Sequence, residues 1–388
     1  MRIADITAGV VGTGFIGMAH VEALRRLGVR VAGVVGSSPE RARAKADETG
    51  LHVYDDMDAL LSDDAVDAVH IASPNDVHAE QAKAVIAAGR HVICEKPLGL
   101  DSSQTTDLTG RAEAGGVVHA VCLNVRFYPL VHEMRALVAN GDIGAPRLVS
   151  GSYLQDWLLL NTDWNWRLEP DRAGALRAVA DIGSHWLDLA TFVTGLRVEA
   201  VMADLHTFVP VRQRPAREVE TFAISGGDVE RVPEQMTSDD AGGILLRFEG
   251  GARGIVTVSQ VSAGRKNAIS IEVDGADSAL AWDSEDPERL WIGHRGRPNE
   301  VLRRDPGLVG EHARSLIGYP GGHVEGYPDT FKALFAKVYA DIAEGGPATP
   351  ASYPTFTDGH DAVCVTEAVA RSAADGTWTT VQRDTRKD

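Results

Sequence analysis

The sequence predicts an α/β protein of two domains: a doubly wound parallel sheet, then an α+β domain on a large open, mostly antiparallel sheet. Short apolar runs alternate with amphipathic stretches over the first third of the chain, as in βαβ units. Strand-like runs separated only by turns fill much of the remainder. The 388 residues suffice for two domains, which we place at residues 1–125 and 126–388.

The first domain is expected to contain five strands and four helices. The helix from Pro39 has a clear start, because a proline in its first turn follows the capping residue Ser38. The predicted strands are Ala8–Val11, Val29–Val35, Val66–Ala72, His91–Cys94 and Val117–Leu123. The predicted helices are Gly17–Leu27, Pro39–Thr49, Val77–Ala88 and Ser102–Ala114.

The second domain is expected to open and close with helices around a series of strands. The predicted helices are Leu130–Asn140, Ile182–Thr194, Thr330–Ala343 and Asp358–Ala374. The predicted strands are Arg147–Gln155, Arg197–Phe208, Gly243–Phe248, Ala252–Val261, Asn267–Val273, Ala279–Trp282 and Arg289–Ile292. The polar segment Gly293–Gly322, rich in glycine and arginine, is expected to be a long ordered loop.

Composition and net charge limit which molecules this protein is expected to bind and where it is expected to lie in the cell. With 38 basic and 55 acidic residues the net charge is −17, which argues against nucleic acid and anionic membranes. Cys94, Cys122 and Cys364 lie far apart, so we expect free thiols in a reducing compartment, the cytoplasm. The sequence has no apolar stretch of about 18 residues for a membrane span, and its N-terminus fits a signal peptide poorly.

A glycine motif joins the first strand to the first helix. Gly12-x-Gly14-x-x-Gly17, with Phe15 and Ile16 inside it, is the dinucleotide-binding pattern. Gly12 makes the tight turn, Gly14 lets a pyrophosphate approach the backbone, and Gly17 lets helix and strand pack closely. The pyrophosphate would lie at the positive end of the helix dipole. The sequence therefore predicts a Rossmann domain that binds NAD or NADP.

The end of the second strand bears on the choice of cofactor. It has no carboxylate where NAD-binding proteins hold the ribose 2′-hydroxyl. Ser37, Ser38 and Arg41 are suited to a 2′-phosphate, so we lean slightly to NADP. The alternative is that the serines only cap the helix, and Glu40 keeps NAD open.

Two further groups of residues indicate acid–base chemistry. Lys96 follows a parallel strand, at the sheet edge where ligands bind, and Pro97 restricts its backbone. Asp181 and His185 are four residues apart on a predicted helix and share one face, with Asp188 three residues further on. Asp181 could instead be a helix cap, or the pair could begin a metal site, although the sequence offers no clear third ligand.

These motifs, together with Ser73-Pro74-Asn75-x-x-His78 and Glu95-Lys96-Pro97, resemble the Gfo/Idh/MocA oxidoreductase family over nearly the whole chain. The resemblance implies a nicotinamide cofactor and a sugar, polyol or cyclitol substrate. It implies catalytic roles for Lys96, Asp181 and His185, and places Pro74, Asn75 and His78 near the cofactor, with Glu95 at the nicotinamide ribose. One departure is Gly174-Ala175-Leu176-Arg177, where small residues are usual, which leaves the substrate open.

Aromatic and polar side chains of the second domain are candidates for sugar recognition, since rings cover C–H faces and polar forks bind hydroxyls. Besides Lys96, Asp181 and His185, the candidates are Arg126, Tyr128, Gln155, Trp164, Trp166, Arg167 and His323. We expect about half of the wider set of strand and loop residues here, tryptophans above all, to be structural. His323 lies in a glycine-rich loop that either closes the site or is simply solvated.

The prediction is an NAD(P)-dependent dehydrogenase or reductase acting on a secondary hydroxyl of a sugar, anhydrosugar or cyclitol. His185, oriented by Asp181, is the first choice of base, and Lys96 would stabilise charge on the same oxygen. Two alternatives are an NAD-retaining glycosidase of the same family and a nucleotide-sensing regulator without turnover. An open sheet exposes an apolar face, so a homodimer or homotetramer is expected.

Overall fold

The computed structural model describes residues 1–216 and 230–383. The chain forms two compact units. The first contains Met1–Asn124 and Pro328–Val363, and the second contains Val125–Tyr327 and Cys364–Asp388. The segment Pro328–Val363 thus packs with the first unit. The predicted domain boundary near residue 125 placed this segment in the second domain.

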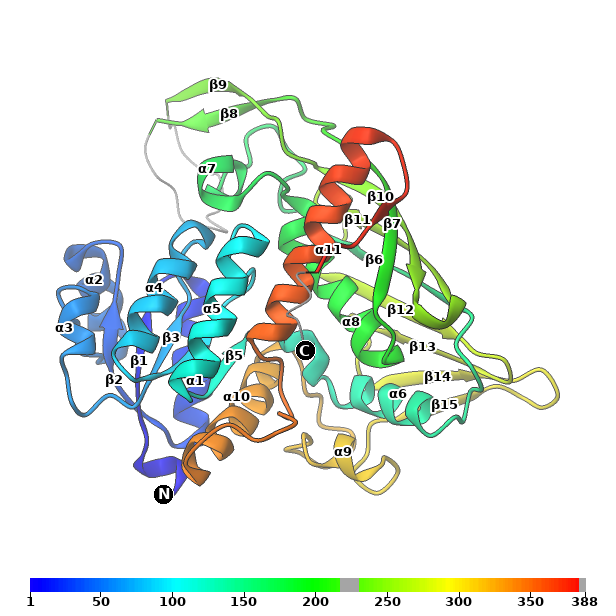
Figure 1. The fold of residues 1–388 in the computed structure, drawn as a ribbon, viewed down its shortest axis with the longest axis horizontal. Coiled ribbons are helices and arrows are strands. Elements are labelled where there is room, and N and C mark those ends of the chain that lie inside the picture. The colour runs from blue at the N-terminus through cyan, green and yellow to red at the C-terminus, as the bar shows by residue number, and fades with distance from the viewer. Residues whose placement is uncertain (217–229, 384–388) are drawn as a thin grey trace. The chain divides into compact units, whose positions relative to one another are not determined.

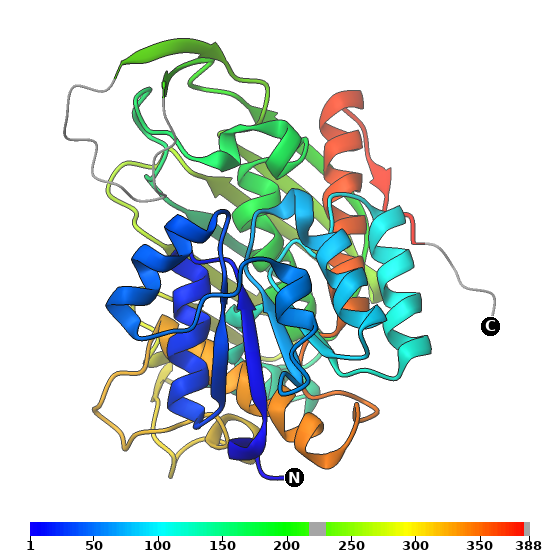
Figure 2. The ribbon, with the colours of Figure 1, turned by 90° about the vertical axis from the view of Figure 1, so that its left-hand side faces the viewer.

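The sheet of the first unit is fully parallel, with strand order β2-β1-β3-β4-β5. Its strands are β1 (Thr7–Val11), β2 (Arg30–Val35), β3 (Ala68–Ile71), β4 (His91–Cys94) and β5 (His119–Val121). Central strands β1 and β3 are buried throughout, as expected for a parallel sheet covered on both faces. The predicted doubly wound sheet is confirmed (Figures 1 and 2).

Helices of the first unit cover both faces of this sheet. They are α1 (Phe15–Leu27), α2 (Pro39–Thr49), α3 (Met57–Leu61), α4 (Asn75–Ala87), α5 (Ser102–Gly115) and most of α10 (Tyr327–Glu344). Val69 and Ile71 of β3 pack in one core cluster with residues of α4 and α5. His70 points the other way, where it contacts His20 of α1 and Phe335 of α10.

The second unit contains a nine-stranded sheet in the order β15-β14-β13-β12-β6-β11-β10-β7-β16. Its strands are β6 (Leu148–Leu154), β7 (Val198–His206), β10 (Ala241–Phe248), β11 (Arg253–Ser259), β12 (Ala268–Asp274), β13 (Ala279–Asp283), β14 (Arg289–Gly293), β15 (Glu300–Arg303) and β16 (Thr379–Thr380). All neighbours are antiparallel except β6 and β11, which run parallel. The predicted mostly antiparallel sheet is confirmed.

Helices cover one face of this sheet and leave apolar side chains exposed on the other. The helices of the second unit are α6 (Pro129–Ala139), α7 (Pro170–Ala173), α8 (Ser184–Thr194), α9 (Glu311–Arg314) and the later part of α11 (Phe356–Asp375). Residues of α6, α8 and α11 share one core with the strands. Along β10 burial alternates, and Leu245 and Ile255 pair directly across β10 and β11 with 42% and 46% of their surfaces exposed.

Three expectations need correction. The segment Gly293–Gly322 is not simply a loop, because it contains β15 and α9. A separate hairpin of β8 (Val211–Pro215) and β9 (Arg231–Gln235) was not predicted, since its charged strands lack an apolar pattern. The helix expected from Ile182 is preceded by a π-helical turn, Val179–Gly183. Among the described helices, none is long and apolar enough to cross a bilayer.

Candidate active site

The glycine loop of the first unit needs glycine at two positions for reasons internal to the fold. Gly12 has φ +109°, and a Cβ there would lie 2.4 Å from the Ala72 carbonyl oxygen. A Cβ on Gly17 would lie 1.9 Å from the carbonyl oxygen of Gly12. Turn geometry and close helix–strand packing therefore explain both residues.

Gly14 has no such internal explanation. Its backbone is extended, with φ −71°, and a Cβ built there has no atom of the described residues within 4 Å. It is the N-cap of α1, so open space lies at the helix end where backbone N–H groups attract anions. This is the cradle that a dinucleotide pyrophosphate requires. Phe15 begins α1 beside it and is 57% exposed.

At the end of β2, the neighbouring residues Ser37 and Ser38 differ in their contacts. Ser38 caps α2, because its Oγ accepts the backbone N–H of Arg41 at 3.3 Å. The capping alternative is therefore realised for Ser38. Ser37 and Arg41 are both exposed.

The ends of β3 and β4, which are neighbouring parallel strands, bring two predicted motifs together. His78, on the first turn of α4, is buried, and its ring nitrogens lie 2.8 Å from the Pro97 oxygen and 2.9 Å from the Ser73 oxygen. Burial lowers the pKa of His78. His78 therefore ties the loop of Pro74 and Asn75 to the loop of Lys96, rather than presenting its own ring to a ligand.

The Glu95 carboxylate is positioned by hydrogen bonds to residues of the first unit. Its Oε1 lies 3.0 Å from His20 Nε2, and its Oε2 accepts the backbone N–H of Lys96 at 3.2 Å. Cys122 Sγ lies 3.8 Å from His20 Nε2. His20, Glu95 and Cys122 thus place three potential metal-ligand atoms within 4.8 Å of one another. The sequence did not indicate this group, because its members come from α1 and from the residues that directly follow β4 and β5.

In the second unit, Asp181 lies on the π-helical turn before α8. Arg167 Nε donates to its Oδ1 at 3.0 Å, and Gln260 Nε2 donates to its Oδ2 at 2.8 Å. These donors orient the carboxylate from two sides. His185 lies on the first turn of α8 with 8% exposure, and its ring centroid is 6.3 Å from that of Tyr153.

Amide side chains gather at one end of the central strands. Gln155 and Gln260 directly follow the parallel strands β6 and β11, and Asn267 directly precedes β12. The Oδ1 of Asn267 accepts from Gln155 Nε2 at 2.7 Å and from Tyr153 Oη at 2.8 Å. Gln155 and Gln260 are buried, yet each Oε1 lacks a hydrogen-bond partner among the described residues. Buried acceptors of this kind need a water or a ligand.

Gln260 and Asn267 belong to this group although they were not predicted as site residues, whereas Gln155 and Asp181 were. The alternating patterns of β6, β11 and β12 indicated the strands. No sequence signal indicated that β6 and β11 run parallel, which is what brings the two glutamines to the same edge.

Several other predicted substrate residues have structural contacts. Arg126 forms a buried pair with Asp188: its Nε donates to Oδ2 at 2.7 Å, and its Nη2 donates to Oδ1. Tyr128 is 5% exposed, and its ring packs 5.0 Å from that of Trp282. Both residues therefore have partners inside the protein, and their contact with substrate stays a prediction.

The two candidate tryptophans are partly buried. Trp164 packs against a small core of Leu158, Leu168 and Met236. Trp166 carries the guanidinium of Arg167 over its ring at 4.5 Å. The stack steers Arg167 toward Asp181.

A buried cluster of charges contacts the segment of Leu158 and Leu160, which lies close to the two tryptophans in sequence. Arg177 and Arg212, with at most 1% exposure, both donate to Asp240 Oδ1. Arg212 also donates to the carbonyl oxygens of Leu158 and Leu160 at 2.7 and 2.9 Å. Buried guanidinium groups need such partners. Through Arg212, the backbone at Leu158 and Leu160 is joined to Asp240.

His323 is exposed, and its Nδ1 contacts the Pro320 oxygen at 3.3 Å. The buried Arg304 organises this region: it pairs with Glu288 and Glu325 and donates to the backbone oxygens of Tyr319 and His323. The glycine-rich loop is therefore ordered by Arg304.

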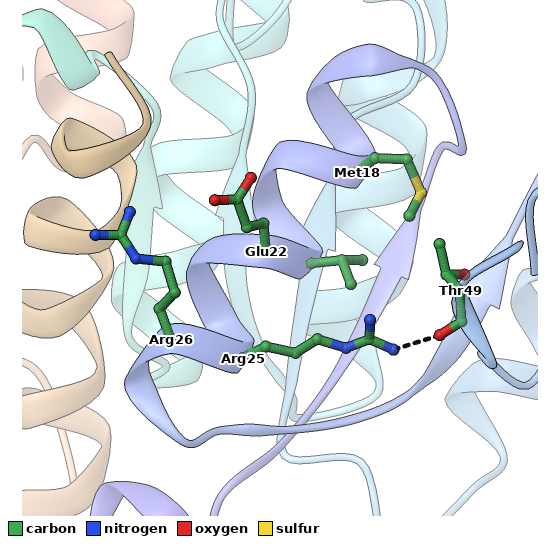
Figure 3. Close-up of a pocket in the computed structure, with 6 residues that line it drawn as sticks. Met18, Glu22, Arg25, Arg26 and Thr49 are labelled. Carbon is green, nitrogen blue, oxygen red and sulfur yellow. Dashed lines mark hydrogen bonds between the residues drawn. The ribbon is translucent and has the colours of Figure 1, made fainter. Parts of the chain in front are cut away.

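A hollow of about 490 Å³ lies between α1 and the C-terminal end of α2 (Figure 3). Arg25 crosses it to the Thr49 carbonyl oxygen, at 2.9 Å. The lining residues are Met18, Val21, Glu22, Arg25, Arg26 and Thr49. None of them is a predicted site residue.

A parallel sheet with an open glycine cradle defines a dinucleotide-binding domain. The model of the oxidoreductase family with an NAD-binding Rossmann fold, GFO_IDH_MocA, matches residues 6–122. The GFO/IDH/MocA C-terminal domain matches residues 131–281. The chain belongs to the Gfo/Idh/MocA family of NAD(P)-dependent oxidoreductases, and the predicted resemblance is confirmed.

Similar proteins include sugar dehydrogenases. The chain is 29% identical to levoglucosan dehydrogenase of Pseudarthrobacter phenanthrenivorans, over 97% of this chain and 98% of that protein. A solved levoglucosan dehydrogenase with NADH and levoglucosan is 27% identical, with TM-score 0.85 and coverage of 97% and 99%. An oxidoreductase domain protein of Kribbella flavida is 32% identical, with TM-score 0.85 and coverage of 98% and 100%.

Other relatives differ in cofactor and substrate. An inositol dehydrogenase homologue of Azotobacter vinelandii, solved with NADH and myo-inositol, is 26% identical, with TM-score 0.84 and coverage of 98% of both chains. D-xylose 1-dehydrogenase (NADP(+)) 2 of Haloferax volcanii is 34% identical over 50% of this chain and 60% of that protein. Relatives thus use either cofactor, and the slight lean to NADP is not established.

Proposed function

We propose that this protein is a dehydrogenase or reductase that moves hydride between NAD(P) and a secondary hydroxyl or ketone of a sugar, anhydrosugar or cyclitol. The observation that carries the cofactor half is Gly14, whose missing side chain leaves open space that the fold itself does not require. Lys96, Glu95 and the loop of Pro74 and Asn75 follow strands at the same sheet edge.

Lys96, Asp181 and His185 are the proposed catalytic residues. The nicotinamide, when bound, accepts or returns the hydride. His185 takes the hydroxyl proton as the alcohol is oxidised, and Lys96 donates a hydrogen bond to the same oxygen as charge develops on it. Arg167 and Gln260 hold the Asp181 carboxylate in place for its role beside the substrate.

The amide group of the second unit supports an uncharged polyhydroxylated substrate. Amides donate and accept at once, so they match hydroxyl groups that do the same. The buried Oε1 atoms of Gln155 and Gln260 are available acceptors, and Asn267 holds Gln155 in place. Within the predicted set, Gln155, Arg167 and the face of Trp166 remain proposed substrate contacts.

The exposed apolar pair of Leu245 and Ile255 supports a homodimer or homotetramer formed through the uncovered sheet face. Light scattering of the purified protein tests this, and a monomer would contradict it. The buried free thiols fit a reducing compartment, and we propose the cytoplasm.

A panel of sugars, anhydrosugars and cyclitols, with NAD and NADP in turn and absorbance followed at 340 nm, tests the function. A dehydrogenase forms one reduced cofactor per product. Product without any net change at 340 nm would instead indicate the cofactor-retaining glycosidase. Tight cofactor binding with no turnover on the whole panel would favour the regulator and contradict the proposal.

A further inference from the structure

Three buried groups of the first unit form a continuous hydrogen-bonded chain that ends at the partly buried Glu95. Tyr339 Oη lies 2.9 Å from His70 Nε2, His70 Nδ1 lies 3.1 Å from His20 Nδ1, and His20 Nε2 lies 3.0 Å from Glu95 Oε1. Tyr339, His70 and His20 have no exposed surface. They come from α10, β3 and α1, so the chain crosses the covered face of the parallel sheet.

The nitrogen-to-nitrogen contact restricts where the protons lie. One Nδ1 must donate and the other must accept. Burial lowers the pKa of His70 well below its usual value, so His70 is neutral and carries one ring proton. Only two arrangements of the chain then remain, and they run in opposite directions.

In the first arrangement every donor points toward Glu95. The Tyr339 hydroxyl donates to His70 Nε2, His70 Nδ1–H donates to His20 Nδ1, and His20 Nε2–H donates to Glu95. Both rings are neutral, and an ionised carboxylate accepts at the end. The backbone N–H of Lys96 also donates to this carboxylate, in agreement with an acceptor-only group.

In the reversed arrangement an extra proton lies between His20 and Glu95, on either group. His20 Nδ1–H then donates to His70, and His70 Nε2–H donates to the oxygen of Tyr339. The Tyr339 hydroxyl proton loses its acceptor, because His70 is the one hydrogen-bond partner of that oxygen among the described residues. An unpaired buried donor is costly, so Tyr339 opposes the reversal.

We propose that His70 and Tyr339 are positioning residues which act through His20 to keep its Nε2–H on Glu95 and this carboxylate ionised. The nicotinamide side of the inference rests on the proposed function: an ionised Glu95 is a fixed acceptor for a ribose hydroxyl beside Lys96. The proton arrangement itself rests only on the contacts of the first unit.

Other titratable groups also face this chain. Burial raises the pKa of the Cys94 and Cys122 thiols well above the usual value, so both remain neutral near pH 7. Burial raises the pKa of Tyr339 in the same way, and Asp67 adds to this effect. Glu95 also acts electrostatically on His78, whose pKa burial lowers, and Lys96 is next to Glu95 in sequence.

The first test reads the ring protons directly. The full-length, cofactor-free protein, labelled with ¹⁵N-histidine, is examined by long-range ¹H–¹⁵N correlation at pH 7, with His20→Gln and His70→Gln to assign the signals. We expect His20 as the Nε2–H tautomer and His70 as the Nδ1–H tautomer. The opposite tautomers, or a doubly protonated His20, would overturn the proposal.

The second test removes only the distal hydroxyl. Tyr339→Phe removes the hydroxyl that holds His70 Nε2 as an acceptor, and in the variant Nε2 has no partner among the described residues in either arrangement. The preference for the first arrangement is therefore lost, and the pH at which the His20–Glu95 pair takes up a proton should rise by about 0.5–1 unit. The ¹⁵N signals of His20 between pH 5 and 8 report this, and cofactor affinity should weaken over the same range. Tyr353→Phe is the matched control, because it removes a buried hydroxyl bonded to Asp341 in the same unit.

An unchanged His20 titration in Tyr339→Phe, or an equal shift in Tyr353→Phe, would overturn the proposal. So would stoichiometric zinc in the purified protein, measured by elemental analysis, because a metal on His20 Nε2 would replace its proton. The expected tautomers without any cofactor binding would support the chain and contradict the proposed function, so the two failures are distinguishable.

Discussion

The two units position their functional residues in different ways. In the first unit the glycine loop and Lys96 directly follow strands of one parallel sheet, so local sequence and a simple topology place them. In the second unit Asp181 is held by Arg167 and Gln260, which are 14 and 79 residues away in the chain. The first arrangement is a property of motifs, and the second is a property of the tertiary fold.

The units also bury charge differently. In the first, a hydrogen-bonded chain of one tyrosine and two histidines ends on one carboxylate. In the second, Arg126 and Arg177 are each paired with an aspartate inside the protein. Neutral groups tolerate burial once they are hydrogen-bonded, whereas buried ions depend on their counter-ions. The second unit should therefore be more sensitive to the loss of a single charge.

The largest expected effect tests that difference. Asp188→Ala leaves the Arg126 guanidinium buried without its counter-ion and should lower the free energy of unfolding by about 3–5 kcal/mol. Asp107→Ala in the first unit breaks an exposed pair with Arg111 and should change it by less than about 1 kcal/mol. Urea denaturation measures both, and equal losses would remove the contrast.

The next largest effect tests whether both units contribute to catalysis. Lys96→Ala and His185→Ala should each lower kcat about 100-fold or more on the true substrate, because each removes a group that acts on the reacting oxygen. Lys83→Ala is the control, because this partly exposed lysine pairs with Glu80 and Asp107, and it should leave kcat unchanged. Near-native kcat in either variant would refute that residue's assignment.

Acid should destabilise the first unit through its buried histidines. Burial lowers the pKa of His70, His78, His91 and His119, so the folded protein binds fewer protons there than the unfolded chain. Their contribution is complete above the unfolded pKa of about 6.5 and is lost as the pH falls below it. The loss approaches about 1.4 kcal/mol per histidine per pH unit. Hydrogen exchange at pH 7 and 5.5 measures it by region, and earlier loss of protection in the second unit would contradict this.

The smallest expected effect distinguishes a glycine that leaves space for the cofactor from a glycine that the packing of the fold requires. Gly14→Ala should preserve stability and weaken cofactor affinity about tenfold, because its methyl group fills open space where the pyrophosphate approaches. Gly17→Ala should destabilise the fold, since its Cβ would overlap the Gly12 carbonyl. Calorimetry and fluorescence titration distinguish them. Unchanged affinity in Gly14→Ala would contradict the cradle.

Sequence reasoning reached most of the first unit but not its closing segment. Periodicity and turn residues gave β4 and α2 with their observed bounds, because a buried strand or capped helix carries its own signal. The return of Pro328–Val363 to the first unit was missed. An amphipathic helix shows that it has an apolar face and does not show which core covers it.

The sequence by itself determined the family, the cofactor loop and the residues proposed for chemistry, since these depend on short motifs with fixed backbone requirements. Tertiary structure alone decided which polar side chains surround them. It paired β6 with β11 in parallel, which brought Gln155 and Gln260 together, and it turned Arg126 inward to Asp188. It also joined Tyr339, 244 residues beyond Glu95 by their numbering, to that carboxylate through two histidines. Hydrogen-bond partners distant in sequence leave no periodic trace in the chain, because only folding brings them within reach.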